Sequence, residues 1–165
     1  MARVVYEVGD DVSTDAIYPG RYMATVLPAE TPQFAFADDA AFSGKLKANQ
    51  ILPGSVIVGG QNFGCGSSRE QAVSCLKGHE LVIIAKSFAR IFLQNSINLG
   101  LRVLPCPTIE AGEGDELEIT ATEVINSTRG RQFLVLALSK SRQAIIDAGG
   151  LVAYTRLRLL HTATN

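Results

Sequence analysis

The sequence has no excess of either charge, with 15 Lys and Arg residues against 16 Asp and Glu residues. A net charge of −1 without a basic run argues against a nucleic acid or an anionic membrane as partner, because both attract clustered lysine and arginine. No apolar run approaches the roughly 18 residues of a membrane span, and the first residues lack the long apolar region of a signal peptide. We therefore expect a soluble cytoplasmic protein.

Cysteine is also scarce, since the 165 residues contain only Cys65, Cys75 and Cys106 and no Cys-x-x-Cys pair. The odd number argues against a disulfide framework, and a chain of this length can bury enough surface to fold without one. The two histidines, His79 and His161, are not at ligand spacing from the cysteines, so no zinc or iron–sulfur site is recognisable. We expect Cys75 and Cys106 to be buried, and Cys65 to be partly exposed.

The apolar segments predict an α/β fold. Residues 81–85 are wholly apolar, which is typical of a parallel strand buried on both faces. Strand and helix patterns alternate from residue 55 to residue 104, and this order predicts a central βαβαβ unit, followed by added antiparallel strands. The expected strands are 4–8, 55–59, 81–85, 101–104, 116–120, 122–126 and 132–138. The expected helices are 71–77, 86–95, 140–148 and a short one from residue 151, with one or two more between 28 and 48.

Two further expectations concern the ends of elements. We expect Ser87 to cap the helix of residues 86–95, and the chain to leave that helix near Gly100. No internal repeat or linker divides the chain, so we expect a single domain over residues 1–165, with a frayed tail at about 161–165.

A glycine-rich loop, residues 62–71, joins the 55–59 strand to the next helix with the sequence Asn-Phe-Gly-Cys-Gly-Ser-Ser-Arg-Glu-Gln. It brings two hydroxyl groups and an arginine to a helix N-terminus, where unpaired N–H groups and the helix dipole favour a bound anion. The planar guanidinium of Arg69 suits a carboxylate or a phosphate. Neither the P-loop nor the dinucleotide-binding glycine pattern fits this loop. The loop therefore predicts a site for a small anionic ligand.

The same loop also permits a purely structural interpretation. Ser67 and Glu70 have the spacing of a capping box, in which each side chain accepts a hydrogen bond from the other residue's N–H. On local chemistry alone this interpretation is the stronger one, because such caps are common and contribute about 1 kcal/mol.

A polar turn with three carboxylates precedes this loop in the sequence. Asp10, Asp11 and Asp15 lack the spacing of an EF-hand calcium loop. We expect Asp10 and Asp11 to be solvated turn residues, whereas Asp15 lies deeper in the loop and is the more interesting candidate.

Three ordered segments, residues 9–17, 62–72 and 85–92, resemble the small subunits of 3-isopropylmalate dehydratase and its relatives, which correspond to the swivel domain of aconitase. The resemblance extends from about residue 4 to residue 154. It implies a swivelling β/β/α domain that docks on a large subunit carrying a [4Fe–4S] cluster. It also implies a hydro-lyase that interconverts 2-isopropylmalate and 3-isopropylmalate by dehydration and rehydration, in leucine biosynthesis.

The resemblance further implies roles for individual residues. Ser67 corresponds to the catalytic base that removes the proton next to a carboxylate, and Ser68 and Arg69 correspond to residues that hold a substrate carboxylate. Asp15 matches the aspartate of the family's Thr-Asp motif in the active site. Physical chemistry supports the first role, because backbone donors at a helix N-terminus can stabilise a serine alkoxide.

Relatives differ in substrate at the loop after Gly20. Homoaconitase-like members carry an arginine in a Tyr-Leu-Arg-Thr pattern for an extra carboxylate, whereas this chain has Tyr22, Met23 and Ala24 before a threonine. An apolar lining suits an isopropyl or methyl branch, so we expect these three residues to contact 2-isopropylmalate. Arg21 lies nearby, which leaves 2,3-dimethylmalate and homoaconitate open. The alternative from a different class is a non-catalytic anion-binding module.

Overall fold

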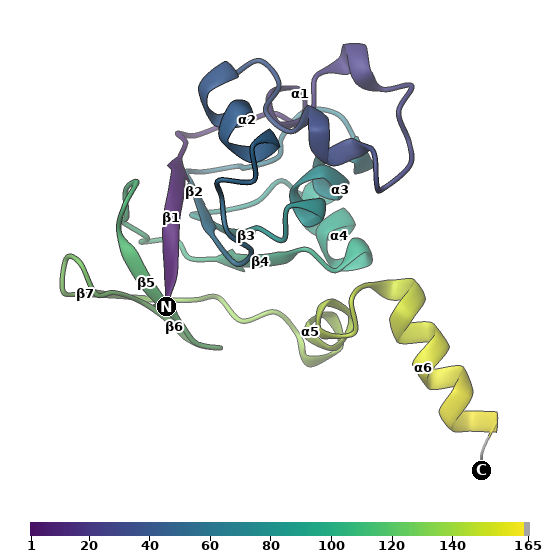
Figure 1. Cartoon of the computed structure of the whole chain (residues 1–165). Helices are drawn as coiled ribbons and strands as arrows, with labels where there is room; N and C mark the ends of the chain where they lie inside the picture. The colour runs from purple at the N-terminus through teal and green to yellow at the C-terminus, as the bar shows by residue number, and fades with distance from the viewer. Residues whose placement is uncertain (164–165) are drawn as a thin grey trace.

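A seven-stranded sheet organises residues 1–163, the part of the chain that the computed structural model describes (Figure 1). The strands lie in the order β4-β3-β2-β1-β5-β6-β7. The pairs among β1 to β4 are parallel, and those from β1 through β5 to β7 are antiparallel. The strands are β1 Ala2–Glu7, β2 Val56–Gly59, β3 Val82–Ala85, β4 Arg102–Pro105, β5 Glu116–Ile119, β6 Glu123–Asn126 and β7 Arg131–Leu134.

Helices α3 and α4 follow β2 and β3 and complete the βαβαβ unit. The α/β class and the added antiparallel strands are therefore confirmed. The helices are α1 Thr14–Ile17, α2 Ala40–Lys47, α3 Glu70–Gly78, α4 Arg90–Leu99, α5 Lys140–Asp147 and α6 Leu151–Ala163, with 3₁₀ turns η1 Gly20–Tyr22 and η2 Thr31–Phe34.

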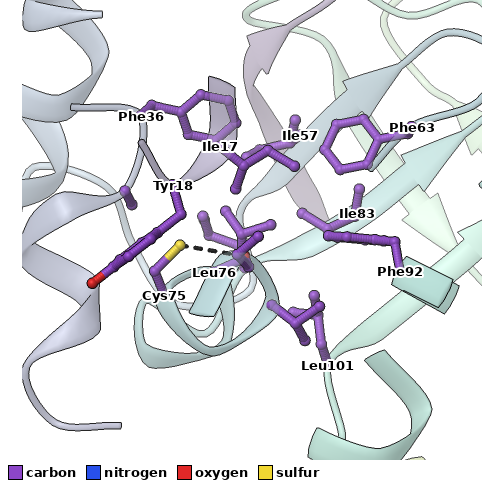
Figure 2. Close-up of a cluster of buried hydrophobic side chains, with 14 of the residues drawn as sticks. Ile17, Tyr18, Phe36, Ile57, Phe63, Cys75, Leu76, Ile83, Phe92 and Leu101 are labelled. Carbon is purple, nitrogen blue, oxygen red and sulfur yellow. Dashed lines mark hydrogen bonds between the residues drawn. The ribbon is translucent and has the colours of Figure 1, made fainter. Parts of the chain in front are cut away.

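The parallel strands bury side chains on both faces, as their apolar runs predicted. Ile57 and Ile83 pack with the apolar sides of α3 and α4 (Figure 2). Val56 and Ile84 belong to a second buried cluster with side chains of β5, β6 and β7. Neighbouring side chains of a strand point to opposite faces. The helices therefore cover one face of the parallel strands, and side chains of β5, β6 and β7 pack against the other. This layering is the β/β/α arrangement that the resemblance implied.

The free cysteines also lie as expected. Cys75 and Cys106 are buried, and Cys65 is partly exposed. Burial raises the pKa of the Cys75 thiol, so this cysteine is an apolar packing residue.

Two expected boundaries differ for reasons that lie outside the local sequence. Ser87 does not cap α4, because its hydroxyl accepts the Asn62 N–H (2.8 Å) and donates to the Gln61 amide oxygen (2.7 Å). Strand β7 ends at Leu134 rather than at residue 138. Beyond it the Leu136 N–H donates to the Pro105 carbonyl (2.8 Å), which draws the chain towards β4.

The ends of α4 and α6 bear on two further expectations. The chain leaves α4 at Gly100, which has φ +74°, as expected. Helix α6 extends away from the sheet (Figure 1) and continues to Ala163, into the tail that we expected to fray; residues 164–165 lie outside the described part. Among residues 1–163, no helix is long and apolar enough to cross a membrane.

Candidate active site

The loops that follow β1, β2 and β3 are joined to one another by hydrogen bonds. The Gly64 N–H donates to the Val12 carbonyl (2.7 Å), and the Phe63 N–H donates to the Ser87 carbonyl (3.0 Å). The carboxyl ends of parallel strands lie at one edge of a sheet, where α/β proteins commonly bind ligands. The glycine-rich loop, residues 62–71, is therefore held at this edge by a neighbour on each side.

Asp10 and Asp11 are solvated, as expected, and they also contribute to this joining. Both are exposed, but Asp10 accepts the Gln61 N–H (2.6 Å) and Asp11 accepts the side-chain amide of Asn62 (2.8 Å). The glycine at position 60 could have predicted this contact, because a Cβ there would lie 2.0 Å from the Asp10 carboxylate. A glycine at a strand end commonly marks such a close backbone approach.

Two glycines shape the loop itself. Gly64 and Gly66 have φ of +81° and +92°, a region that residues with a side chain rarely adopt. A Cβ on Gly64 would lie 2.2 Å from the Phe92 ring, so the backbone here rests directly on α4. Both positions therefore favour glycine, and Gly64 is required by the close approach of Phe92 as well.

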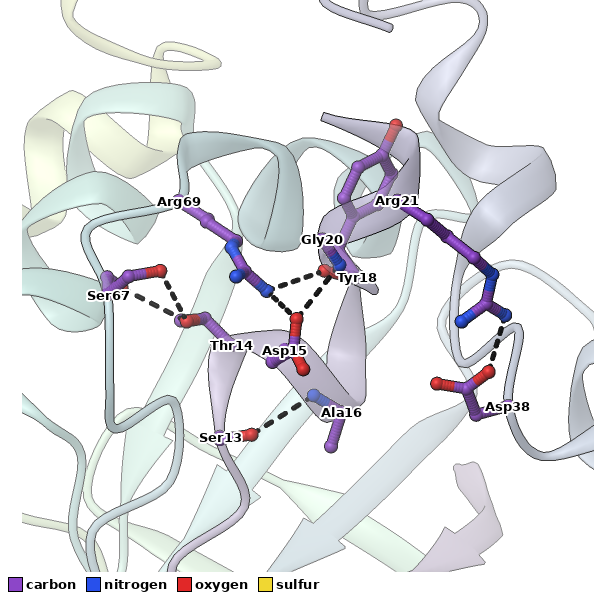
Figure 3. Close-up of polar contacts among 10 residues, drawn as sticks. All are labelled: Ser13, Thr14, Asp15, Ala16, Tyr18, Gly20, Arg21, Asp38, Ser67 and Arg69. Carbon is purple, nitrogen blue, oxygen red and sulfur yellow. Dashed lines mark hydrogen bonds and ion pairs between the residues drawn. The ribbon is translucent and has the colours of Figure 1, made fainter. Parts of the chain in front are cut away.

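Ser67 does not form the capping box that local chemistry favoured. Helix α3 begins at Glu70 with Arg69 at the N-cap, and no side chain caps it. Instead, the Ser67 hydroxyl lies 3.2 Å from the hydroxyl of Thr14, which also donates to the Ser67 carbonyl (3.1 Å; Figure 3). Ser67 is exposed, so its hydroxyl can reach a ligand.

Arg69 and Asp15 form an ion pair beside this serine (Figure 3). The same guanidinium nitrogen, Nη1, donates to the Tyr18 carbonyl (3.2 Å), and the Gly20 N–H donates to Asp15 (2.8 Å). The hydrogen bonds from Arg69 and Gly20 hold the pKa of Asp15 below its ordinary value. Asp15 is therefore an anion that orients the guanidinium, and the structure brings together two residues that the sequence separated.

Ser68 is exposed next to Ser67. Its carbonyl accepts the side-chain amide of Asn95 on α4 (3.4 Å). No sequence signal pointed to Asn95, which braces the loop through the backbone.

The loop of Tyr22, Met23 and Ala24 lies near the start of α3, because the side-chain amide of Gln71 donates to the Met23 carbonyl (3.5 Å). Met23 and Ala24 are exposed, whereas the Tyr22 ring stacks on Phe34 with centroids 4.2 Å apart. The exposed apolar side chains of this loop are thus those of Met23 and Ala24.

Arg21 is turned away from Arg69 and pairs with Asp38 (Figure 3). Its guanidinium also lies over the Tyr22 ring, 4.7 Å from the centroid, and the hydrogen bond to Asp38 raises the pKa of Arg21. A second arginine is therefore not presented beside Arg69 in this structure.

Across the described residues, no group of three His, Cys, Asp or Glu side chains is placed to hold a metal ion.

Known proteins match this chain over most of its length. The family model described as the aconitase C-terminal domain matches residues 14–108. The 3-isopropylmalate dehydratase small subunit of Thermodesulfovibrio yellowstonii is 42% identical over 161 residues, which are 94% of this chain and 93% of that protein. The isopropylmalate/citramalate isomerase small subunit of Methanocaldococcus jannaschii is 43% identical, with the same coverage of both chains.

The fold also matches that of a solved structure. A crystal structure of 3-isopropylmalate dehydratase from Methanocaldococcus jannaschii superposes with a TM-score of 0.88 at 40% identity, covering 98% of this chain and 96% of that one. Because sequence and fold agree over nearly the whole of both chains, this chain belongs to the aconitase C-terminal domain family, among the 3-isopropylmalate dehydratase small subunits.

Proposed function

We propose that this chain is the small subunit of a hydro-lyase that interconverts 2-isopropylmalate and 3-isopropylmalate, in leucine biosynthesis. Relatives more than 40% identical over nearly the whole chain are named 3-isopropylmalate dehydratase small subunit, and the site geometry supports the proposal. The observation that carries the proposal is that Ser67 does not cap α3 and is exposed beside Arg69.

The side chains of the site suit proton removal next to a carboxylate. Ser67 is the base, and Ser68 and Arg69 hold the carboxylate. The hydrogen bonds of Arg69 within residues 1–163 all come from Nη1, and a guanidinium has five N–H donors. The other N–H groups can therefore bind a substrate carboxylate while Asp15 keeps the guanidinium in place.

The site also favours a second chain as part of the enzyme. Ser67 and Ser68 are exposed, and charge stabilisation of an alkoxide is much stronger where water is excluded. We propose that a large subunit covers the site in a cytoplasmic heterodimer and carries the [4Fe–4S] cluster that family membership suggests. The roles of Ser67, Ser68 and Arg69 require no metal ligand from this chain.

The substrate we favour is a malate with an apolar branch. Met23 and Ala24 offer an apolar surface beside the start of α3, and Arg21 is held by Asp38 rather than presented to a further carboxylate. A relative 43% identical is named for both isopropylmalate and citramalate, so members this similar differ in substrate. 2,3-Dimethylmalate and homoaconitate therefore remain alternatives for the test.

The proposal is tested by capturing this chain anaerobically from its native lysate and assaying the complex. We expect a large iron–sulfur subunit to co-purify, and the complex to turn over 2-isopropylmalate faster than it dehydrates 2,3-dimethylmalate or hydrates homoaconitate. A complex that acts only on another of these acids would correct the substrate. A chain that binds dicarboxylates without a partner or turnover would instead support an anion-binding module.

Arg69→Lys is expected to raise the KM of this complex by about 10-fold, because lysine keeps the charge but loses the planar pair of donors. Steady-state kinetics on 2-isopropylmalate measure the change. Arg21→Lys is the matched control, since Arg21 pairs with Asp38 away from Ser67, and its KM should stay within about 2-fold. Unchanged KM and turnover in Arg69→Lys would argue against substrate contact by Arg69.

A further inference from the structure

The hydroxyl of the proposed base is hydrogen-bonded to a buried threonine. Thr14 is only 2% exposed, and its hydroxyl oxygen lies 3.1 Å from the Ser67 carbonyl oxygen and 3.2 Å from the Ser67 hydroxyl oxygen. The Thr14 N–H also donates to the Cys65 carbonyl (2.8 Å). Backbone and side chain of Thr14 are therefore both tied to the glycine-rich loop.

The number of protons restricts how these two hydroxyls can be paired. Thr14 has one hydroxyl proton. When Thr14 donates it to the Ser67 carbonyl, the 3.2 Å contact requires Ser67 to donate to Thr14. When Ser67 has released its own proton to water, the alkoxide can only accept. Rotation about the Cβ–Oγ bond of Thr14 can then redirect its hydrogen bond from the Ser67 carbonyl to the alkoxide. The proton stays on Thr14, and both acceptors are at nearly the same distance from it.

A single short helix, α1, carries residues that contact Ser67 and Arg69. Thr14 and Asp15 are the first two residues of α1. Thr14 contacts the hydroxyl of Ser67, and Asp15 pairs with the guanidinium of Arg69 (Figure 3). The aspartate of this Thr-Asp pair already had a role in the proposed site, whereas the threonine had none.

We propose that Thr14 is a positioning residue for the Ser67 base, donating a hydrogen bond to Ser67 Oγ when this oxygen is ionised and to the Ser67 carbonyl when it is not. The inference rests on the proposed function, in which Ser67 takes the substrate proton. As the substrate C–H bond breaks, its electron pair forms the C=C bond, the hydroxyl on the neighbouring carbon leaves as hydroxide, and the proton joins Ser67 Oγ. The hydroxide and the proton that Ser67 released to water together make the water molecule that is lost. Thr14 keeps its own proton throughout, and once Ser67 Oγ is protonated the Thr14 hydroxyl again donates its hydrogen bond to the Ser67 carbonyl.

Thr14→Val tests this role, because valine keeps the shape of threonine and lacks the hydroxyl. We expect kcat of the complex to fall by about 10- to 100-fold, the range for a hydrogen bond to a charged group, with KM within about 2-fold. Thr14→Ser restores the hydroxyl and should bring kcat back to within about 3-fold of wild type. If Thr14→Val does not fold, Thr14→Ser is compared with Thr14→Ala, from which it differs only by the hydroxyl.

Thr31 provides a matched control. Thr31 is fully buried. Its hydroxyl donates to the Pro28 carbonyl (3.2 Å) and lies 2.9 Å from the hydroxyl of Ser74, so it too is a buried threonine between a backbone carbonyl and a serine hydroxyl, but outside the site. Thr31→Val should lower the thermal stability about as much as Thr14→Val and leave kcat unchanged. A kcat loss in Thr14→Val no larger than in Thr31→Val would overturn the inference, and so would a Thr14→Ser variant that stays impaired.

Ser67→Gly in the same assay separates the two possible failures. If Ser67→Gly is inactive while Thr14→Val matches wild type, the inference about Thr14 is wrong and the serine base stands. If Ser67→Gly keeps its turnover, or if the wild-type complex has none, the serine base is wrong and the role of Thr14 fails with it.

Discussion

Ser67→Gly is expected to lower the turnover of the reconstituted complex by about 10²-fold or more, because it removes the general base. The fold should survive. Ser67 does not cap α3, and the buried Thr14 hydroxyl keeps its bond to the backbone carbonyl of residue 67. Steady-state turnover of 2-isopropylmalate, with thermal unfolding of the isolated chain, measures both effects.

Ser139→Gly serves as the control for this substitution. Ser139 is an exposed serine that does cap a helix, since it accepts the Arg142 N–H at the start of α5 (3.4 Å). The exchange should cost a few tenths of a kcal/mol and leave turnover unchanged. Near-normal turnover in Ser67→Gly would refute the assignment of the base.

The central part of the fold could be predicted because its signals are local. An all-apolar run such as residues 81–85 suits only a strand covered on both sides, and a glycine after a helix, such as Gly100, indicates its end. Ser87 shows where this reasoning fails. Its local sequence is that of a cap, but its hydroxyl bonds to Gln61 and Asn62 across the sheet edge, and no local pattern contains that contact.

The site was only partly predictable for the same reason. Segments at compatible spacing pointed to Ser67, Arg69 and Asp15, but nothing in the sequence pairs Asp15 with Arg69 or Thr14 with Ser67. These contacts exist because the loops after β1 and β2 meet at one sheet edge. The capping box failed because the bend at Gly66 turns Ser67 towards Thr14 instead of the helix.

Gly64→Ala is expected to destabilise the fold by about 2–5 kcal/mol, more than any other substitution considered for this chain. Alanine at φ +81° costs about 1–2 kcal/mol. Its Cβ would also lie 2.2 Å from the Phe92 ring, and such overpacking costs about 1–3 kcal/mol. For a chain of this size the melting temperature should fall by about 4–20 °C, which thermal unfolding of the isolated chain measures.

Gly54→Ala separates the two contributions, because Gly54 has nearly the same φ, +79°, and a Cβ at that position would have no neighbouring atom within 4 Å. It should lose only the backbone part, about 1–2 kcal/mol. If both variants lose the same stability, packing against Phe92 does not contribute. If Gly64→Ala loses more, the excess measures how tightly the loop that carries Ser67 rests on α4, and the turnover of the complex should fall with it, since displacing a base by about 1 Å can cost 10²-fold.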